Sequence, residues 1–248
     1  MILSRRLTSD QGLWDGRFMA RAAEGRMRHR TMAEYALAEL REAIILGELP
    51  AGTPLRLDEL ARSLGMSISP IREAVRQLEA LGLAKHVPHQ GARVLDFDID
   101  ELRDLFEVRL ALESLAVRRA AERFSEADAT AARAQLERLD ELRGEGDVRQ
   151  TMRAHTDFHF TLYEASQSSW LVSLIRPAWD RSERFRPALF TAENEPQVRH
   201  RELDGRLLAA CEEHDPAAAA QALYEHLELA SLFFETELAG EGIFARGA

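Results

Sequence analysis

Apolar residues recur at intervals of three and four positions from Met32 onward, a spacing that is typical of one face of an amphipathic helix. The members of this stripe are Ala33, Leu37, Leu40, Ile44 and Ile45. Gly47 is the expected end of the helix, and a run of glycine and proline over residues 50–54 separates it from a shorter one. For that second helix the sequence predicts Asp58 as the cap and Gly65 as the end.

A third helix is predicted to start at Ser69, which is a good N-cap. Pro70 then occupies the first helical position, where the missing N–H costs nothing. The apolar stripe of this helix comprises Ile71, Val75, Leu78 and Leu81. Gly82 closes the helix, and residues 83–94 hold two short apolar segments around a turn with proline and glycine, which predicts a β-hairpin. Three helices and a hairpin make a winged helix-turn-helix.

The rest of the chain has a helical pattern throughout. Asp100 is the expected cap of a long helix that runs to about Phe124, and Ser125 with Asp128 forms a near capping box for the next helix, which ends at Arg143. We therefore expect a mostly α fold, in which the winged helix-turn-helix precedes an all-α bundle of six to seven helices.

The later helices of this bundle are bounded by residue type. Gly144-Glu145-Gly146 is the expected loop after the second bundle helix, and Asp215-Pro216 gives the last helix a cap and a first-turn proline. The further helical stretches are predicted at residues 149–166, 169–191 (bent near Pro177 and Pro187), 195–213 and 216–239.

These boundaries define the domain organisation. Residues 31–96 form the predicted DNA-binding domain, and residues 97–240 form a helical domain for ligand, metal and dimerisation. Residues 241–248 are a tail. Residues 1–30 carry seven arginines without apolar periodicity; we interpret them as a flexible or loosely helical arm, with a basic arm that touches phosphate as the alternative.

Composition is that of a globular protein with a sizeable core, because 46% of the residues are apolar and 30% are charged. The single cysteine, Cys211, excludes an internal disulfide framework and favours an intracellular, cytoplasmic protein. No apolar run approaches the roughly 18 residues of a membrane span, so no membrane partner is expected. The N-terminal residues also lack the pattern of a secretory signal.

The net charge of −10 is unevenly divided. Residues 1–97 hold 14 Lys and Arg against 12 Asp and Glu, a net charge of +2, while the remaining residues hold 18 and 30, a net charge of −12. The two parts of the chain therefore face different partners. Double-stranded DNA as a partner of the first part depends on where the arginines cluster, not on bulk charge.

Such a cluster is predicted on the third helix, because a helix fits the DNA major groove and reads base edges with its N-terminal residues. Arg72 and Arg76 lie one turn apart and can act together on a guanine edge or on phosphates. The alternative is an ordinary amphipathic helix with a solvated polar face. All candidate DNA contacts are Arg56, Ser67, Ser69, Arg72, Arg76, Gln90, Gly91 and Arg93.

The sequence resembles the GntR family of bacterial regulators in three segments: LGELPAGTPL at 46–55, ELARSLGMSISPIREAVRQLEALGL at 59–83 and QGARV at 90–94. The helical part is similar to the FCD-type ligand-binding domain of the FadR subgroup. The resemblance implies a ligand-responsive, homodimeric transcription factor of the winged helix-turn-helix class. It also implies that Arg72 contacts bases, that Ser67 and Ser69 contact the backbone, and that Gln90 and Gly91 enter the minor groove.

One position departs from this family pattern. The family often has arginine where this chain has Ile68. Isoleucine cannot hydrogen-bond a base or a phosphate, although it can contact a thymine methyl group. The departure therefore predicts a variant operator.

A histidine pair stands out in the helical part. His155 and His159 are four residues apart on one predicted helix, so their side chains lie on the same face and could hold a metal. The resemblance implies a divalent metal bound by one Asp and three His. Asp204 and His226, on two later helices, complete that set, with His155 at the usual Asp position and Asp204 at a usual His position. His200 is the alternative to Asp204 if the register shifts by one turn.

The chemistry of these ligands suits Zn, Ni, Mn or Fe, without a choice among them. The resemblance implies that Arg109 lines the ligand cavity, where its guanidinium matches a carboxylate. Arg109 is therefore the candidate effector-binding residue. The alternative is an intrahelical pair with Glu113, four residues on. A small organic acid is the expected effector.

We therefore predict a regulator, in most such proteins a repressor released by its ligand, and not an enzyme. Ligand binding would shift the dimer arrangement and thereby the spacing of the two recognition helices. Two alternatives stay open: a metal-dependent enzyme that uses the His/Asp cluster, and a regulator whose metal is purely structural.

Overall fold

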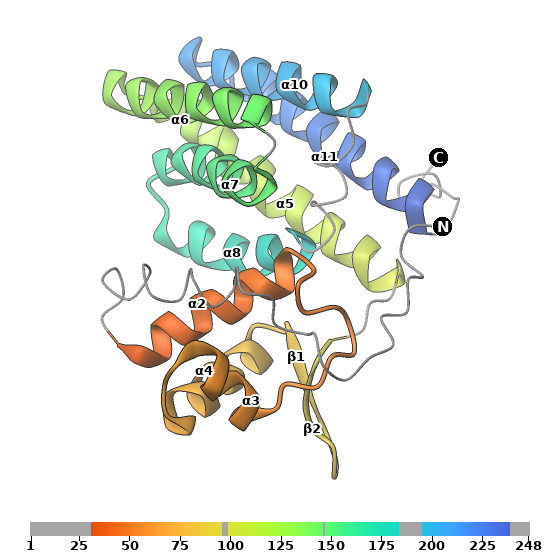
Figure 1. Cartoon of the computed structure of the whole chain (residues 1–248). Helices are drawn as coiled ribbons and strands as arrows, with labels where there is room; N and C mark the ends of the chain where they lie inside the picture. The colour runs from red at the N-terminus through yellow and green to blue at the C-terminus, as the bar shows by residue number, and fades with distance from the viewer. Residues whose placement is uncertain (1–30, 96–98, 146, 184–194, 239–248) are drawn as a thin grey trace. The chain divides into compact units, whose positions relative to one another are not determined.

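The computed structural model describes residues 31–95, 99–145, 147–183 and 195–238, which form two compact units, one up to residue 95 and one from residue 99. The predicted arm at residues 1–30, the tail at 241–248 and the predicted bend at Pro187 lie outside the described residues. The mostly α fold predicted from the sequence is confirmed: three helices and a hairpin come first, and helices follow (Figure 1).

The first unit is a three-helix cluster with a two-stranded hairpin. Its elements are α2 (Met32–Ile45), α3 (Leu57–Leu64), α4 (Ile68–Ala80), β1 (Ala84–Val87) and β2 (Gly91–Val94). Thr31 and Glu34 form a capping box at the start of α2. One face of each helix supplies the core, whose largest fully buried members include Tyr35, Leu40, Leu60, Leu64 and Ile71.

Two helices of this unit begin earlier than the sequence predicts. The N-cap of α4 is Ser67, not Ser69, and the helix starts at Ile68. Pro70 is thus the third helical residue; it is tolerated there because none of the first four N–H groups of a helix has an intrahelical acceptor. Arg56, not Asp58, is the N-cap residue of α3. Gly65 ends α3 in the left-handed region with a φ of 62°, as expected.

The hairpin is antiparallel, with Ala84 opposite Val94 and Val87 opposite Gly91. Residues 88–90 form the turn, and Gly91 has a φ of 77°, which favours glycine. At the other end of β2, Arg93 donates from Nη1 to the carbonyl oxygen of Gly52, 2.9 Å away. The hairpin is therefore tied to the loop between α2 and α3.

The second unit is an all-helical bundle, as predicted, with six helices in its described residues. They are α5 (Ile99–Arg123), α6 (Glu126–Glu145), α7 (Val148–Ala165), α8 (Ser169–Glu183), α10 (Glu195–Glu212) and α11 (Pro216–Leu238). Helix α5 packs against α7, α8, α10 and α11, and α6 packs against α7 and α10. The long helix α5 is thus the central element of the bundle (Figure 1).

Helix ends in the bundle lie where the predicted caps place them, with two exceptions. Ser125 and Asp128 form the predicted reciprocal pair, and Asp215 Oδ1 accepts from the N–H groups of Ala217 and Ala218. Helix α5, however, begins at Ile99, so Asp100 lies in its first turn. Helix α6 continues to Glu145 through two residues that the sequence assigns to a loop. A single helical glycine costs only about 1 kcal/mol relative to alanine, which packing along the helix can offset.

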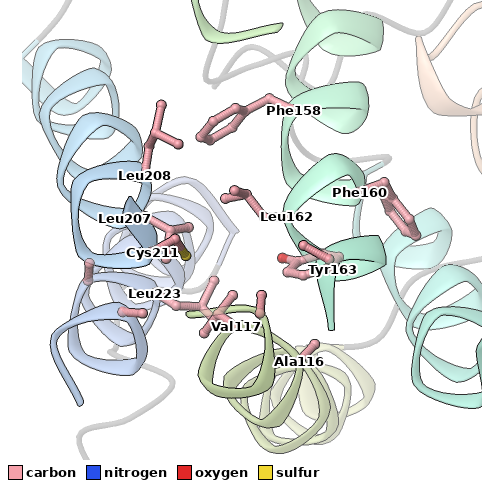
Figure 2. Close-up of a cluster of buried hydrophobic side chains, with 14 of the residues drawn as sticks. Ala116, Val117, Phe158, Phe160, Leu162, Tyr163, Leu207, Leu208, Cys211 and Leu223 are labelled. Atoms are coloured by element: carbon pink, nitrogen blue, oxygen red, sulfur yellow. The ribbon is translucent and has the colours of Figure 1, made fainter. Parts of the chain in front are cut away.

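The hydrophobic core of the bundle lies between α5, α7, α10 and α11. Figure 2 shows Val117, Leu162, Leu207 and Leu223 converging from these four helices. Each of these side chains is fully buried. Because α7, α10 and α11 are held together by this core, polar side chains one or two turns away on the same helices are brought to one place.

Candidate metal centre and DNA-reading surface

The exposed face of α4 carries the residues predicted to contact DNA. Ser67, Ser69, Arg72 and Arg76 are all exposed, while Ile71, Ala74, Val75 and Leu78 of the same helix are buried. This division follows helix periodicity, because residues 72 and 76 are one turn apart on the side away from the core. Within the first unit the polar face of α4 is thus open to a partner.

The other candidate DNA contacts differ in their exposure and in the partners of their side chains. Gln90 and Gly91 are exposed at the hairpin tip. Arg56 is 65% exposed and pairs with Glu59 at 3.1 Å. Arg93 is half-buried and its Nη1 is bound to Gly52, so part of its guanidinium serves the fold. The DNA-binding role of each of these residues stays a prediction.

The four predicted metal ligands come together in the bundle. His155 and His159 of α7, Asp204 of α10 and His226 of α11 each offer one ligand atom, and these atoms all lie within 4.8 Å of one another. All four side chains are buried, none more than 1% exposed. Four polar side chains from three helices therefore share one small interior space.

The spacing of their atoms fits a metal ion. Asp204 Oδ1 lies 3.3 Å from His159 Nε2 and 3.2 Å from His226 Nδ1. Two ligand atoms of a tetrahedral zinc ion, each about 2.1 Å from the metal, lie about 3.4 Å apart. Neither Asp204 Oδ1 nor His159 Nε2 makes a hydrogen bond of good geometry within the described residues. A shared cation would satisfy both atoms.

The second carboxylate oxygen of Asp204 is already bound. Arg143, in the last turns of α6, donates from Nη2 to Asp204 Oδ2 at 2.7 Å and from Nη1 to Asp140 at 3.0 Å. Burial alone would raise the pKa of the Asp204 carboxyl, but the imidazoles of His226 and His159 hold that pKa well below its ordinary value. Asp204 is therefore an anion, with one oxygen directed to the histidines and the other to an arginine.

Arg109 lies close to this cluster, and each of its three nitrogen atoms donates a hydrogen bond. It is 1% exposed, and its Nε and Nη2 donate to the two carboxylate oxygens of Glu113 at 2.6 and 3.2 Å. Its Nη1 donates to Ser182 at 2.8 Å, and its Cζ lies 4.5 Å from the centre of the Trp179 ring. Burial lowers the pKa of Arg109, but the charge and hydrogen bonds of Glu113, together with Tyr163 and Glu183, outweigh burial and the net pKa is raised. The intrahelical pair considered from the sequence is present, and it is buried.

Tyr163 connects the two groups. Its hydroxyl donates to Glu113 Oε2 at 2.6 Å and lies 3.4 Å from His159 Nδ1. A path of contacts thus runs from Arg109 through Glu113 and Tyr163 to His159. Sequence reasoning missed Tyr163, although it follows His159 by four residues on the same helix face.

Two further residues border the four ligands. His200, the alternative to Asp204, is 3% exposed, and its Nδ1 lies 3.4 Å from His226 Nδ1. The ring of Trp179 stacks on that of His155 with the centres 5.5 Å apart. Asp204, and not His200, belongs to the group of four whose ligand atoms converge. Which residues bind a metal stays a prediction.

Comparison with known proteins identifies both units. Residues 32–94 match the family described as bacterial regulatory proteins, gntR family, and residues 104–229 match the FCD domain. The chain belongs to the GntR family of regulators. This GntR-family protein is thus a transcriptional regulator with a helix-turn-helix DNA-binding domain and an FCD domain, as the resemblance in the sequence implied.

Individual relatives span most of this GntR-family chain. It is 28% identical to the HTH-type transcriptional regulator McbR of Escherichia coli over 82% of this chain and 93% of that protein. It is 35% identical to a probable D-xylose utilization operon transcriptional repressor of Paenarthrobacter nicotinovorans, over 64% of this chain and 68% of the relative. The solved structure of E. coli McbR/YncC superposes with a TM-score of 0.76 at 26% identity, covering 84% of this chain and 99% of the other.

Among the described residues, no helix has both the length and the apolar character that crossing a membrane requires.

Proposed function

We propose that this GntR-family regulator is a ligand-released repressor whose FCD domain holds a divalent metal and senses a small organic acid. The observation that carries the proposal is the buried group of His155, His159, Asp204 and His226, with ligand atoms within 4.8 Å of one another. Buried polar groups are costly unless they are paired, and a divalent cation would pair Asp204 Oδ1 and His159 Nε2, neither of which makes a hydrogen bond of good geometry within the described residues. A bound Zn, Ni, Mn or Fe ion would supply coordination positions for a carboxylate.

The surroundings of Arg109 constrain how an acid could bind. Three of its five N–H donors are held by Glu113 and Ser182. In this proposal an effector carboxylate displaces one of these acceptors when it binds Arg109. Such a displacement would disturb the Glu113–Tyr163–His159 path, and this is how acid and metal would be coupled.

Repression is favoured by a relative that is itself described as a probable repressor. The regulatory step is linkage: an effector that binds one arrangement of the dimer better than another changes DNA affinity by that difference in binding free energy. The winged domain would contact the operator with Arg72 and Arg76 of each copy.

Homodimer formation is supported by a stripe on the outer face of α5, the α5 stripe. Its residues repeat at intervals of four and three and are all exposed: Asp104, Val108, Ala111, Leu115 and Arg118. This is the spacing of a coiled-coil seam. Val108 and Leu115 are 48% and 46% exposed.

The α5 stripe is also self-complementary. Asp104 lies seven residues before Ala111 and Arg118 seven residues after it. If two copies of α5 cross antiparallel at Ala111, Asp104 of each copy meets Arg118 of the other, and the apolar residues face each other between them. A two-fold interface requires such a match of a surface with itself.

The metal is tested by elemental analysis and by calorimetric titration of Zn, Ni and Mn into chelator-treated protein. We expect about one ion per chain, and loss of high-affinity binding in His159→Ala and Asp204→Asn. The control is His86→Ala, which removes an exposed histidine of β1 and should leave the stoichiometry unchanged. Retention of the ion in Asp204→Asn with loss in His200→Ala would assign the fourth ligand position to His200, the alternative to Asp204.

The effector is tested by titrating a panel of small organic acids into the protein with and without metal. One acid should bind, its affinity should fall on chelation, and Arg109→Gln should weaken it more than Arg143→Gln does. Circular dichroism establishes that each variant is folded. If the protein bound metal but no acid, the metal would have a structural role, and the proposed sensing of an organic acid would be contradicted.

A further inference from the structure

Ile68 is an exposed aliphatic residue at the start of α4. It is the first residue of the helix, and 42% of its surface is exposed. It precedes Arg72 by four residues and Arg76 by eight, so the three side chains lie along one line of the helix. Whatever Arg72 faces, Ile68 faces one turn nearer the N-terminus.

The core of the first unit does not use this side chain. The buried stripe of α4 consists of Ile71, Ala74, Val75 and Leu78, and Ile68 belongs neither to the core cluster nor to the half-buried residues packed on it. The residues on either side, Ser67 and Ser69, are exposed and polar. An apolar side chain thus stands among hydroxyl groups and guanidinium groups on the face of the recognition helix.

The DNA major groove offers one base-specific apolar group, the 5-methyl of thymine. The N-terminal residues of a recognition helix are those that reach base edges. We propose that Ile68 reads a thymine methyl, so that each operator half-site holds a thymine beside the base that Arg72 contacts. This inference rests on the proposed position of α4 in the major groove.

The probe is a duplex selected from random DNA by the full-length protein, in which deoxyuridine then replaces each thymidine in turn. This replacement removes the methyl group and leaves every hydrogen-bonding group in place. We expect one thymine per half-site whose replacement weakens binding about fourfold, the amount that corresponds to one buried methyl group. Replacement in both half-sites should weaken binding about sixteenfold, the product of the two.

Two variants identify the side chain that reads the methyl group. Ile68→Ala should bind the thymine and uracil duplexes equally at that position. Ile68→Arg should select guanine there, because arginine recognises the guanine edge. Met32→Ala is the control, since Met32 is also 42% exposed and borders the same polar face of α4 but lies on α2. It should keep the thymine preference.

The outcomes separate this inference from the proposed function. Failure to select any sequence would overturn operator recognition itself, and the inference with it. Selection of an operator in which no thymine-to-uracil change matters would overturn the inference alone. An unchanged preference for thymine in Ile68→Ala would also overturn it, because another residue would then contact the methyl group.

Discussion

At the scale of single residues, the surroundings of a buried group decide whether it carries charge. Asp204 and Cys211 both lie on α10 and are fully buried. Imidazoles hold the pKa of Asp204 well below its usual value, whereas burial, aided by the charge of Glu212, raises the pKa of Cys211 to about 12. Asp204 is therefore available as an anionic ligand. Cys211 stays a protonated thiol in the apolar core, which Figure 2 shows beside Leu207 and Leu223.

The state of Cys211 gives a direct prediction. At pH 8 the native protein should react with iodoacetamide at least a hundredfold more slowly than the protein in 6 M guanidinium, because the thiolate is the nucleophile and the folded protein suppresses it. Mass spectrometry of the intact protein measures the reaction. Comparable rates in the two states would mean that α10 opens readily or that the thiol is not buried.

Single residues also mark what the sequence could predict about the site. The spacing of His155 and His159 places both on one face of a helix whatever the fold, so that pair was predictable. The contact of Arg143 with Asp204 joins residues 61 positions apart on two helices. An arginine near the end of a charged helix resembles a solvated surface residue, and only the packing of α6 against α10 reveals its role.

At the scale of elements, the buried ion pair of α5 has a large consequence for stability. Arg109 and Glu113 are 1% and 0% exposed and share two hydrogen bonds. An exposed pair at this spacing would stabilise a helix by only about 0.3–0.5 kcal/mol. Removing one partner of a buried pair costs far more, because the remaining charge is left without compensation in the interior.

Glu113→Gln should therefore lower the free energy of unfolding by about 3–5 kcal/mol. The double variant Arg109→Met with Glu113→Leu should be more stable than Glu113→Gln, since it removes both charges and keeps the volume. Asp100→Asn is the control, because Asp100 pairs with Arg103 at a 79% exposed position, where about 0–1 kcal/mol is at stake. Urea denaturation followed by circular dichroism gives all three values. Equal stability of Glu113→Gln and the wild type would contradict the buried pair.

Element boundaries show the limit of local signals in this chain. A left-handed backbone at a helix end favours glycine, so the ends at Gly65 and Gly82, with φ of 62° and 68°, were predicted correctly. Serine caps are weaker signals, and Ser67 and Ser69 both qualify. In the structure Ser67 is the N-cap residue of α4, although the Ser67 side chain makes no capping hydrogen bond. The two serines are thus left exposed for other contacts.

At the scale of the whole molecule, the proposed repressor consists of two copies of the chain. Because Asp104 and Arg118 would pair across the α5 stripe, Asp104→Arg should place two cations opposite each other and shift the protein toward monomer. Arg118→Asp should do the same with two anions. The double variant should restore the dimer. Sedimentation velocity at micromolar concentration measures all three.

The matched control is Glu137→Arg, which reverses a charge at an exposed position of α6, away from the α5 stripe. It should leave the mass unchanged. A dimer that persists in Leu115→Glu and in both single charge reversals would mean that another surface holds the copies together.

The most direct test of the proposed ligand-released repressor is the affinity of the full-length, metal-loaded protein for fluorescent duplexes from the DNA beside its own gene, measured by anisotropy at fixed salt. We predict that one duplex binds at least a thousandfold more tightly than random DNA. Arg72→Ala should lose most of this preference. An organic acid should release the duplex only while metal is bound. Equal affinity for specific and random DNA, or binding that no combination of metal and acid changes, would contradict a ligand-released repressor.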